Sequence, residues 1–406
     1  MNVLRRLPLS RLLLVCVAML VVGATATAVA ASLGGFPKPA PKPLASAVHD
    51  ALSAPAVPGV SADITFTNKL IDGASIQGRT PLLTGATGRV WLSNDGHARL
   101  ELQSNRGDTQ ILYDGQTVSY YDSSSGTEYR LALPASHSKT SATDQHKGAP
   151  TVASIQKTLS NLMSHANVSG AIPSDVAGRP TYQVRISPQH DGGLLGAAEL
   201  EWDSLRGAPL RLAVYAANRT DPVLELKATK VSYGSVPAAA FTLPKARKVV
   251  DVKRPTAASP AARTAHRNRH HVKASGQSAV QAAVPFHLSA PAALDQLPRQ
   301  SVELLDMGGH PAALVTYGKG LGGIAVIEQA VGAKDKAPSS GSSAPSDSGS
   351  GHGGSTALPT VSINGSSGSE LATALGTLVR FQRAGVSYIV LGSVPPLAAE
   401  QAARGL

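Results

Sequence analysis

Four acidic residues in strand-like segments are the first candidates for chemistry: Asp63, Glu101, Glu199 and Glu201. Two carboxylates on either side of a sugar can cleave a glycosidic bond. Each of these four, however, occupies the polar phase of an alternating apolar–polar run. The arginines interleaved with them are Arg99, Arg185 and Arg211. We therefore expect cross-strand charge pairs on a water-exposed face, no enzyme activity, and a wall-associated hydrolase only as the disfavoured alternative.

The histidines His266, His270 and His271 are the best candidates for a metal site. Lysines and arginines flank them, and metal binding needs several convergent ligands, so a solvated basic segment is the better interpretation. The only cysteine is Cys16, which excludes disulfides and cysteine-based zinc sites from the rest of the chain. The sequence has neither a G-x-S-x-G elbow nor a phosphate-binding P-loop. No cofactor and no metal are predicted.

The net charge of +11 over 406 residues belongs to two short segments. Residues 1–11 contain three arginines and no acid, while residues 245–273 contain nine lysines and arginines against Asp251 alone. The remainder of the chain is therefore neutral. A nucleic-acid-binding surface would need cations spread over a folded face, so no nucleic-acid partner is predicted.

The N-terminal segment has the features of an export signal or a membrane anchor. Three arginines precede the uncharged apolar stretch Leu12–Phe36, which is long enough to span a bilayer. Ala28-Val29-Ala30 also fits a cleavage site, so a cleaved signal and a retained anchor both stay open. In either case we expect the chain to lie outside the cytoplasm, with residues 37–43 as a proline-rich spacer.

The elements that follow are mostly strands with one apolar side. Apolar residues alternate with polar ones around residues 62–66, 100–102, 182–186, 198–202, 210–214 and 224–228. Glycine-containing turns separate these runs, as in Asn94-Asp95-Gly96, Asp114-Gly115 and Gly207-Ala208-Pro209. Helical spacing indicates short helices only near Leu44–Leu52 and Val152–Met163.

We predict an α+β fold: a curved antiparallel sheet with helices in its concavity. The interior residues would then line a space that is either filled or hollow. They are Ile64, Phe66, Leu100, Leu102, Val184, Leu200 and Leu212. A hollow space would suit an acyl chain, since burying each CH₂ gains about 0.8 kcal/mol.

Three segments in this region resemble the bacterial lipoprotein-carrier (LolA-like) family. They are residues 113–122, which read Y-D-G-Q-T-V-S-Y-Y-D, residues 200–212, and residues 236–244, which read V-P-A-A-A-F-T-L-P. The resemblance covers roughly residues 44–244. It implies an unclosed, half-barrel sheet wrapped around helices, with an apolar cavity that accepts acyl chains.

The remaining chain reads as a connector and a small C-terminal α/β domain. Residues 245–284 are basic and lack apolar periodicity, so we expect a disordered linker. Residues 285–406 contain strand-like segments, a Gly/Ser-rich insertion over 334–358, and a final helix, Leu397–Arg404, with Ser393 as a possible cap.

This C-terminal part resembles that of the MucB/RseB-type envelope regulators. The similar segments are residues 314–321, which read L-V-T-Y-G-K-G-L, and residues 390–398, which read V-L-G-S-V-P-P-L-A. The resemblance implies a sensor of lipid or lipoprotein that acts on an anti-sigma-like membrane protein in the bacterial cell envelope. A lipid or lipoprotein carrier without a regulatory partner is the alternative.

Overall fold

The computed structural model describes residues 38–71, 81–133, 150–252, 274–332 and 358–406, except residues 106, 191, 218 and 308. The segment Leu12–Phe36, the histidines 266–271 and nearly all of the insertion 334–358 lie outside this part of the chain. In the part described, no helix combines the length and the apolar character needed to cross a bilayer.

The larger of two sheets contains thirteen strands. They are β1 Gly59–Asn68, β2 Ala86–Ser93, β3 Ala98–Ser104, β4 Gly107–Tyr113, β5 Thr117–Asp122, β6 Thr127–Ala132, β7 Ala166–Val168, β8 Ile172–Val176, β9 Arg179–Pro188, β10 Leu195–Asp203, β11 Pro209–Ala216, β12 Leu224–Tyr233 and β13 Lys248–Asp251.

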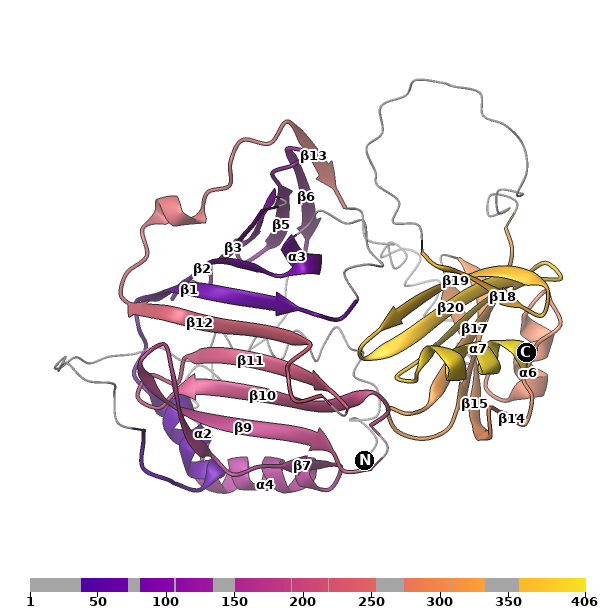
Figure 1. Cartoon of the computed structure of the whole chain (residues 1–406), viewed down its shortest axis with the longest axis horizontal. Helices are drawn as coiled ribbons and strands as arrows, with labels where there is room; N and C mark the ends of the chain where they lie inside the picture. Colours follow the sequence, from indigo (N-terminus) through magenta and orange to yellow (C-terminus); the bar gives the residue numbers. More distant parts are fainter. Residues whose placement is uncertain are drawn as a thin grey trace, which may run out of the picture.

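The strand order shows an open sheet with β13 at one edge and β7 at the other: β13-β6-β5-β4-β3-β2-β1-β12-β11-β10-β9-β7, with β8 also paired to β9. Only the β13–β6 pair is parallel. The strands β2 to β6 turn away from the plane of β9 to β12, so the sheet is curled into a half-barrel (Figure 1). The fold predicted for this region is thereby confirmed.

Two longer helices and two short ones accompany this sheet: α2 Leu44–Ser53, α3 Pro81–Thr84, α4 Val152–Met163 and the 3₁₀ helix η3 Ala238–Phe241. Helix α2 buries Ala45 and Ala47. Its C-terminal end approaches Gly207 so closely that a Cβ there would lie 2.2 Å from the carbonyl oxygen of Ala51. Glycine at this turn therefore lets the helix reach the sheet, and it also adopts a positive φ of 68°.

Helix α4 begins where the sequence predicted, because Thr151 caps it by accepting a hydrogen bond from the Ser154 backbone N–H. It packs against α2 and β7. Only Ile155 is buried along its length, so α4 covers less of the structure than its apolar spacing indicated.

The smaller sheet contains eight strands in the order β14-β15-β16-β17-β21-β20-β19-β18. They are β14 Ala293–Leu294, β15 Leu297–Met307, β16 His310–Tyr317, β17 Ile324–Ala330, β18 Thr360–Ile363, β19 Ser366–Thr373, β20 Gly376–Arg383 and β21 Val386–Gly392. Every neighbouring pair is antiparallel. With helices α6 Gln277–Ala283 and α7 Pro396–Arg404 beside it, this part is α+β in character instead of α/β.

Ser393 does not cap the final helix, contrary to expectation. Helix α7 follows Pro395 and has no side-chain cap, and proline at its first position needs no backbone N–H partner. The Ser393 hydroxyl instead donates to the carbonyl oxygen of Leu375. The residue is therefore used in a loop contact.

The ends of the segment 245–284 are ordered, which differs from the disordered linker expected there. Residues Lys248–Asp251 form β13 against β6, and residues Gln277–Ala283 form α6 with Val280 fully buried. Parallel pairing with a strand some 120 residues earlier leaves no local pattern in the sequence, so periodicity could not indicate β13.

Candidate functional site: an apolar sheet face and a buried polar network

All seven residues predicted to line an interior lie on one face of the larger sheet, which we call the apolar face. The register pairs Ile64 with Gly88 and Gly88 with Leu102, while Leu100 pairs with Val90. On the other half, Leu200 pairs with both Val184 and Leu212, and Leu212 reaches Phe66 through Leu226. Directly paired residues of an antiparallel sheet point the same way, so the seven share one face.

The seven side chains on the apolar face differ in how deeply they are buried. Leu102, Ile64 and Val184 are buried, whereas Phe66, Leu100 and Leu200 are half-buried. Leu212, at the middle of the second half, is 42% exposed. An apolar side chain in the centre of a sheet face normally loses most of its accessible surface on folding. The face is therefore closed at some positions and open at Leu212.

Helix α2 closes one part of the apolar face. Ala47 packs with Tyr182, Val184 and Trp202, and Leu200 lies beside this cluster. The Trp202 side chain is buried, and its indole N–H has no hydrogen-bond partner within the part of the chain that the structure describes. A buried donor without an acceptor is costly in free energy and is uncommon in folded proteins.

The end of β8 and the turn that follows it cover another part of the apolar face. Val176 packs against Leu210, Ala228 and Val231 on the apolar face. Nearby, the Tyr233 hydroxyl donates to Asp203 Oδ2 over 2.7 Å. Burial, followed by the negative charge of Asp203, raises the pKa of the Tyr233 hydroxyl, so this group stays protonated and serves as a fixed donor.

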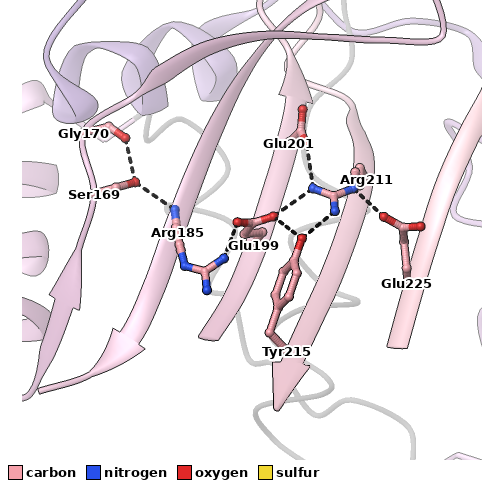
Figure 2. Close-up of polar contacts among 8 residues, drawn as sticks. All are labelled: Ser169, Gly170, Arg185, Glu199, Glu201, Arg211, Tyr215 and Glu225. Carbon is pink, nitrogen blue, oxygen red and sulfur yellow. Dashed lines mark hydrogen bonds and ion pairs between the residues drawn. The ribbon is translucent and has the colours of Figure 1, made fainter. Parts of the chain in front are cut away.

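The opposite, polar face carries a network centred on Arg211 (Figure 2). Its guanidinium Nη1 lies 2.9 Å from Glu199 Oε2 and 2.8 Å from Glu201 Oε1, and its Nε lies 2.6 Å from Glu225 Oε1. Figure 2 shows the side chains arriving from neighbouring strands, with Tyr215 beneath Arg211. The Tyr215 hydroxyl donates to Glu199 Oε2, and Arg185 binds the other oxygen of Glu199.

This network is buried, which corrects the expectation of a wet face at Glu199 and Glu201. Burial opposes ionisation of Glu199, yet hydrogen bonds from Tyr215, Arg185 and Arg211 outweigh it and lower the pKa of the carboxyl. Burial opposes the charge of Arg211 too, but hydrogen bonds with Tyr215, Glu225, Glu199 and Glu201 raise the pKa of its guanidinium. Ionised groups with complete partners hold neighbouring strands together and leave no acid or base ready for proton transfer.

The other two predicted acids, on β1 and β3, take no part in this network and have arginine partners of their own, as expected. Arg89 Nε lies 3.0 Å from Asp63 Oδ1, and Arg99 Nη2 lies 3.0 Å from Glu101 Oε2. The four carboxylates therefore do not converge on one reaction centre. Among the residues that the structure describes, no group of three His, Cys, Asp or Glu side chains could hold a metal ion.

No protein-family model and no curated protein matches the chain. Among solved structures, it is similar to MucB in complex with MucA(peri), at 15% identity and a TM-score of 0.39, covering 89% of this chain and 94% of that one. The MucA/MucB complex of Pseudomonas aeruginosa matches over the same shares, at 16% identity and a TM-score of 0.38.

A LolA-superfamily protein from Nitrosomonas europaea matches at 9% identity and a TM-score of 0.22, covering 50% of this chain and 98% of that one. These structures are of the two kinds that the sequence motifs resembled. With TM-scores below 0.5, the matches assign no activity, ligand or partner to this chain.

Proposed function

We propose that this chain is a non-catalytic, extracytoplasmic protein of the bacterial cell envelope that binds an acyl chain of a lipid or lipoprotein on its apolar face. It is membrane-anchored or secreted through its N-terminal segment. The observation that carries the proposal is the one-sided apolar sheet that is buried at Leu102 and open at Leu212.

An acyl chain needs only a dry surface of matching length. The apolar face supplies one from Leu100 to Val184, across the centre of an open sheet. Covering the exposed part of Leu212 with a hydrocarbon chain removes both apolar surfaces from water. This burial stabilises the complex by about 25 cal/mol per Å² of apolar surface. Binding of this kind requires no catalytic group.

The free indole N–H of Trp202 supports a ligand with a carbonyl group. It lies on the apolar face beside Leu200 and is a buried donor that could point an ester or amide oxygen into place. The Thr109 hydroxyl, paired with Leu102 on the same face, is likewise buried without a partner among the described residues. Ligand sites that are mostly apolar commonly use a few polar groups of this type to fix orientation. We expect an acyl ester or amide to bind better than a plain hydrocarbon.

Lipid extraction and mass spectrometry of the purified full-length chain test this function. We expect acyl lipids in the wild-type protein and a clear loss in Leu212→Glu, which puts a charge on the open part of the face. Leu391→Glu is the matched control, since Leu391 is 38% exposed on β21 of the smaller sheet. A wild-type protein without any acyl ligand, or equal losses in the two variants, contradicts the proposal.

A regulatory role is the second part of the proposal. The smaller sheet has its own buried core, which includes Tyr317, Ile324 and Phe381, and so can present a stable surface to an anti-sigma-like membrane protein. Pull-down with the full chain from bacterial membranes tests this role. Capture of such a partner supports regulation, whereas capture of lipoproteins alone favours the simple carrier.

A further inference from the structure

We propose that helix α4 lies on the surface of an anionic lipid bilayer, with its exposed apolar residues inserted between the head groups. This inference rests on the proposed envelope location and adds an orientation: the β7 edge of the larger sheet faces the membrane. The observations that support it are the exposure of α4, its charge, and the position at which the chain enters the fold.

The apolar stripe of α4 is largely unpartnered. Val152, Ile155, Leu159, Leu162 and Met163 recur at helical spacing and so share one side of the helix. Ile155 alone is buried, while Val152, Leu162 and Met163 are exposed. A helix in water normally packs such a stripe against its own protein. A helix at a membrane interface instead buries the stripe in the lipid.

The charge around the helix suits an anionic surface. From Thr151 to Ser174 the chain contains no aspartate or glutamate, and Lys157 lies within α4 with His165 just after it. On the neighbouring helix α2, the charge of Asp50 is met by Lys42 over 2.7 Å. Cations beside inserted apolar residues are attracted to anionic head groups.

The chain enters the structure at the same edge of the sheet. The carbonyl oxygen of Ala40 accepts a hydrogen bond from the Tyr182 hydroxyl on β9, and Lys42 forms a bridge with Ala171. His49 of α2 contacts the carbonyl oxygen of Pro150, directly before α4. The uncharged stretch Leu12–Phe36 precedes Lys38 by two residues in the sequence, so a retained anchor would lead into the fold at this edge.

The test uses the full chain, with Cys16→Ser, in vesicles of phosphatidylcholine and phosphatidylglycerol. A polarity-sensitive fluorophore is placed on Met163→Cys. The matched control is Val249→Cys on β13, at the opposite edge of the sheet, since Met163 is 47% and Val249 46% exposed. We expect a blue shift and quenching by brominated lipid at position 163 only, because interfacial helices reach about 5–10 Å into the head-group region.

An unshifted probe at position 163, or equal shifts at both positions, overturns the inference. A shift produced by monomeric lysolipid below its micelle concentration overturns it as well, since that result indicates a bound lipid molecule instead of a bilayer. As a second measurement, hydrogen exchange across residues 152–163 should slow on vesicles for the wild type but not for Lys157→Glu/Met163→Glu. Acyl-lipid extraction is scored separately, so failure of the proposed function remains distinguishable from failure of this orientation.

Discussion

The backbone N–H of Leu194 donates to the carbonyl oxygen of Ser393 over 2.9 Å, and this bond joins the larger sheet to the smaller one. The Ser393 hydroxyl also lies 3.0 Å from the Leu194 nitrogen. A second backbone bond, from Ala374 to the carbonyl oxygen of Leu70, connects the same two parts. Leu194 lies in the β9–β10 loop and Leu70 follows β1, so the smaller sheet is contacted from two places in the larger one. Figure 1 shows the β9–β10 loop beside the smaller sheet.

Gly193→Ala should break this joint. A Cβ at residue 193 would lie 2.1 Å from the carbonyl oxygen of Ser393, a distance that no real Cβ tolerates. We expect faster hydrogen exchange at the Leu194 amide and a larger radius of gyration by small-angle scattering. Gly178→Ala is the control, because Gly178 also has a positive φ but no atom within 4 Å of its Cβ position. Unchanged exchange at Leu194 would show that the joint is not a close contact.

Arg211→Met should destabilise the larger sheet by about 3–5 kcal/mol, because it leaves buried carboxylates without their shared cation. The measurement is the free energy of unfolding in urea. Arg89→Met is the control: the Arg89 and Asp63 side chains are 65% and 44% exposed, and such pairs contribute about 0–1 kcal/mol. Similar losses in both variants would rule out a special role for the buried network.

Glu328 should make stability depend on pH. It is fully buried on β17, and burial raises the pKa of its carboxyl to about 7, opposed only by the backbone N–H of Ser289 at 2.9 Å. The folded protein therefore binds a proton that the unfolded chain releases near pH 4.5. The resulting stabilisation is complete below pH 4.5 and is lost as pH rises through 7, at a total of about 3 kcal/mol.

Glu328→Gln should remove this dependence and be the more stable protein at pH 8, as measured by urea unfolding at pH 5 and pH 8. Glu303→Gln is the control, since Glu303 is an exposed glutamate on β15 of the same sheet, two strands from β17. A wild-type protein whose stability is the same at both values of pH would contradict this assignment.

Tryptophan fluorescence should report ligand binding on the apolar face. The chain has two tryptophans, and Trp202 lies on that face while Trp91 lies on the polar face beneath the Arg99 guanidinium. Adding an acyl lipid should change the emission of the wild type and of Trp91→Phe, and leave that of Trp202→Phe constant. A change that follows Trp91 instead would place the ligand elsewhere.

Much of the larger sheet could be predicted because its strands carry a local signal. Residues 62–66, 182–186 and 198–202 alternate strictly, and turns such as Asn94-Asp95-Gly96 separate neighbouring strands. The shared face of the seven apolar residues follows from the same alternation. Strand β19 carries no such signal, because its Ser/Gly-rich sequence, S-S-G-S-E-L-A-T, contains little apolar periodicity.

The candidate site was less predictable, since burial depends on packing between distant segments. Alternation places Glu199 and Glu201 on the polar face. It does not show that Tyr215 and Glu225 bind Arg211 beside them. Alternation also places Leu212 on the apolar face, but it does not show that Leu212 is exposed while Leu102 is fully buried. Glu328 likewise lies in a short apolar run, and only the structure shows that its Oε1 is buried without a hydrogen-bond partner among the described residues.

Strand β13 is also the point from which the chain leaves the larger sheet for the smaller one. The chain leaves the larger sheet from the β13 edge and reaches Ser275 after the 21 residues 253–273, which can extend to about 70 Å. The Leu194–Ser393 bond, by contrast, joins the two sheets directly and is directional. A ligand that widens the curl of the larger sheet would therefore strain this bond, so the smaller sheet would register the change at Ser393.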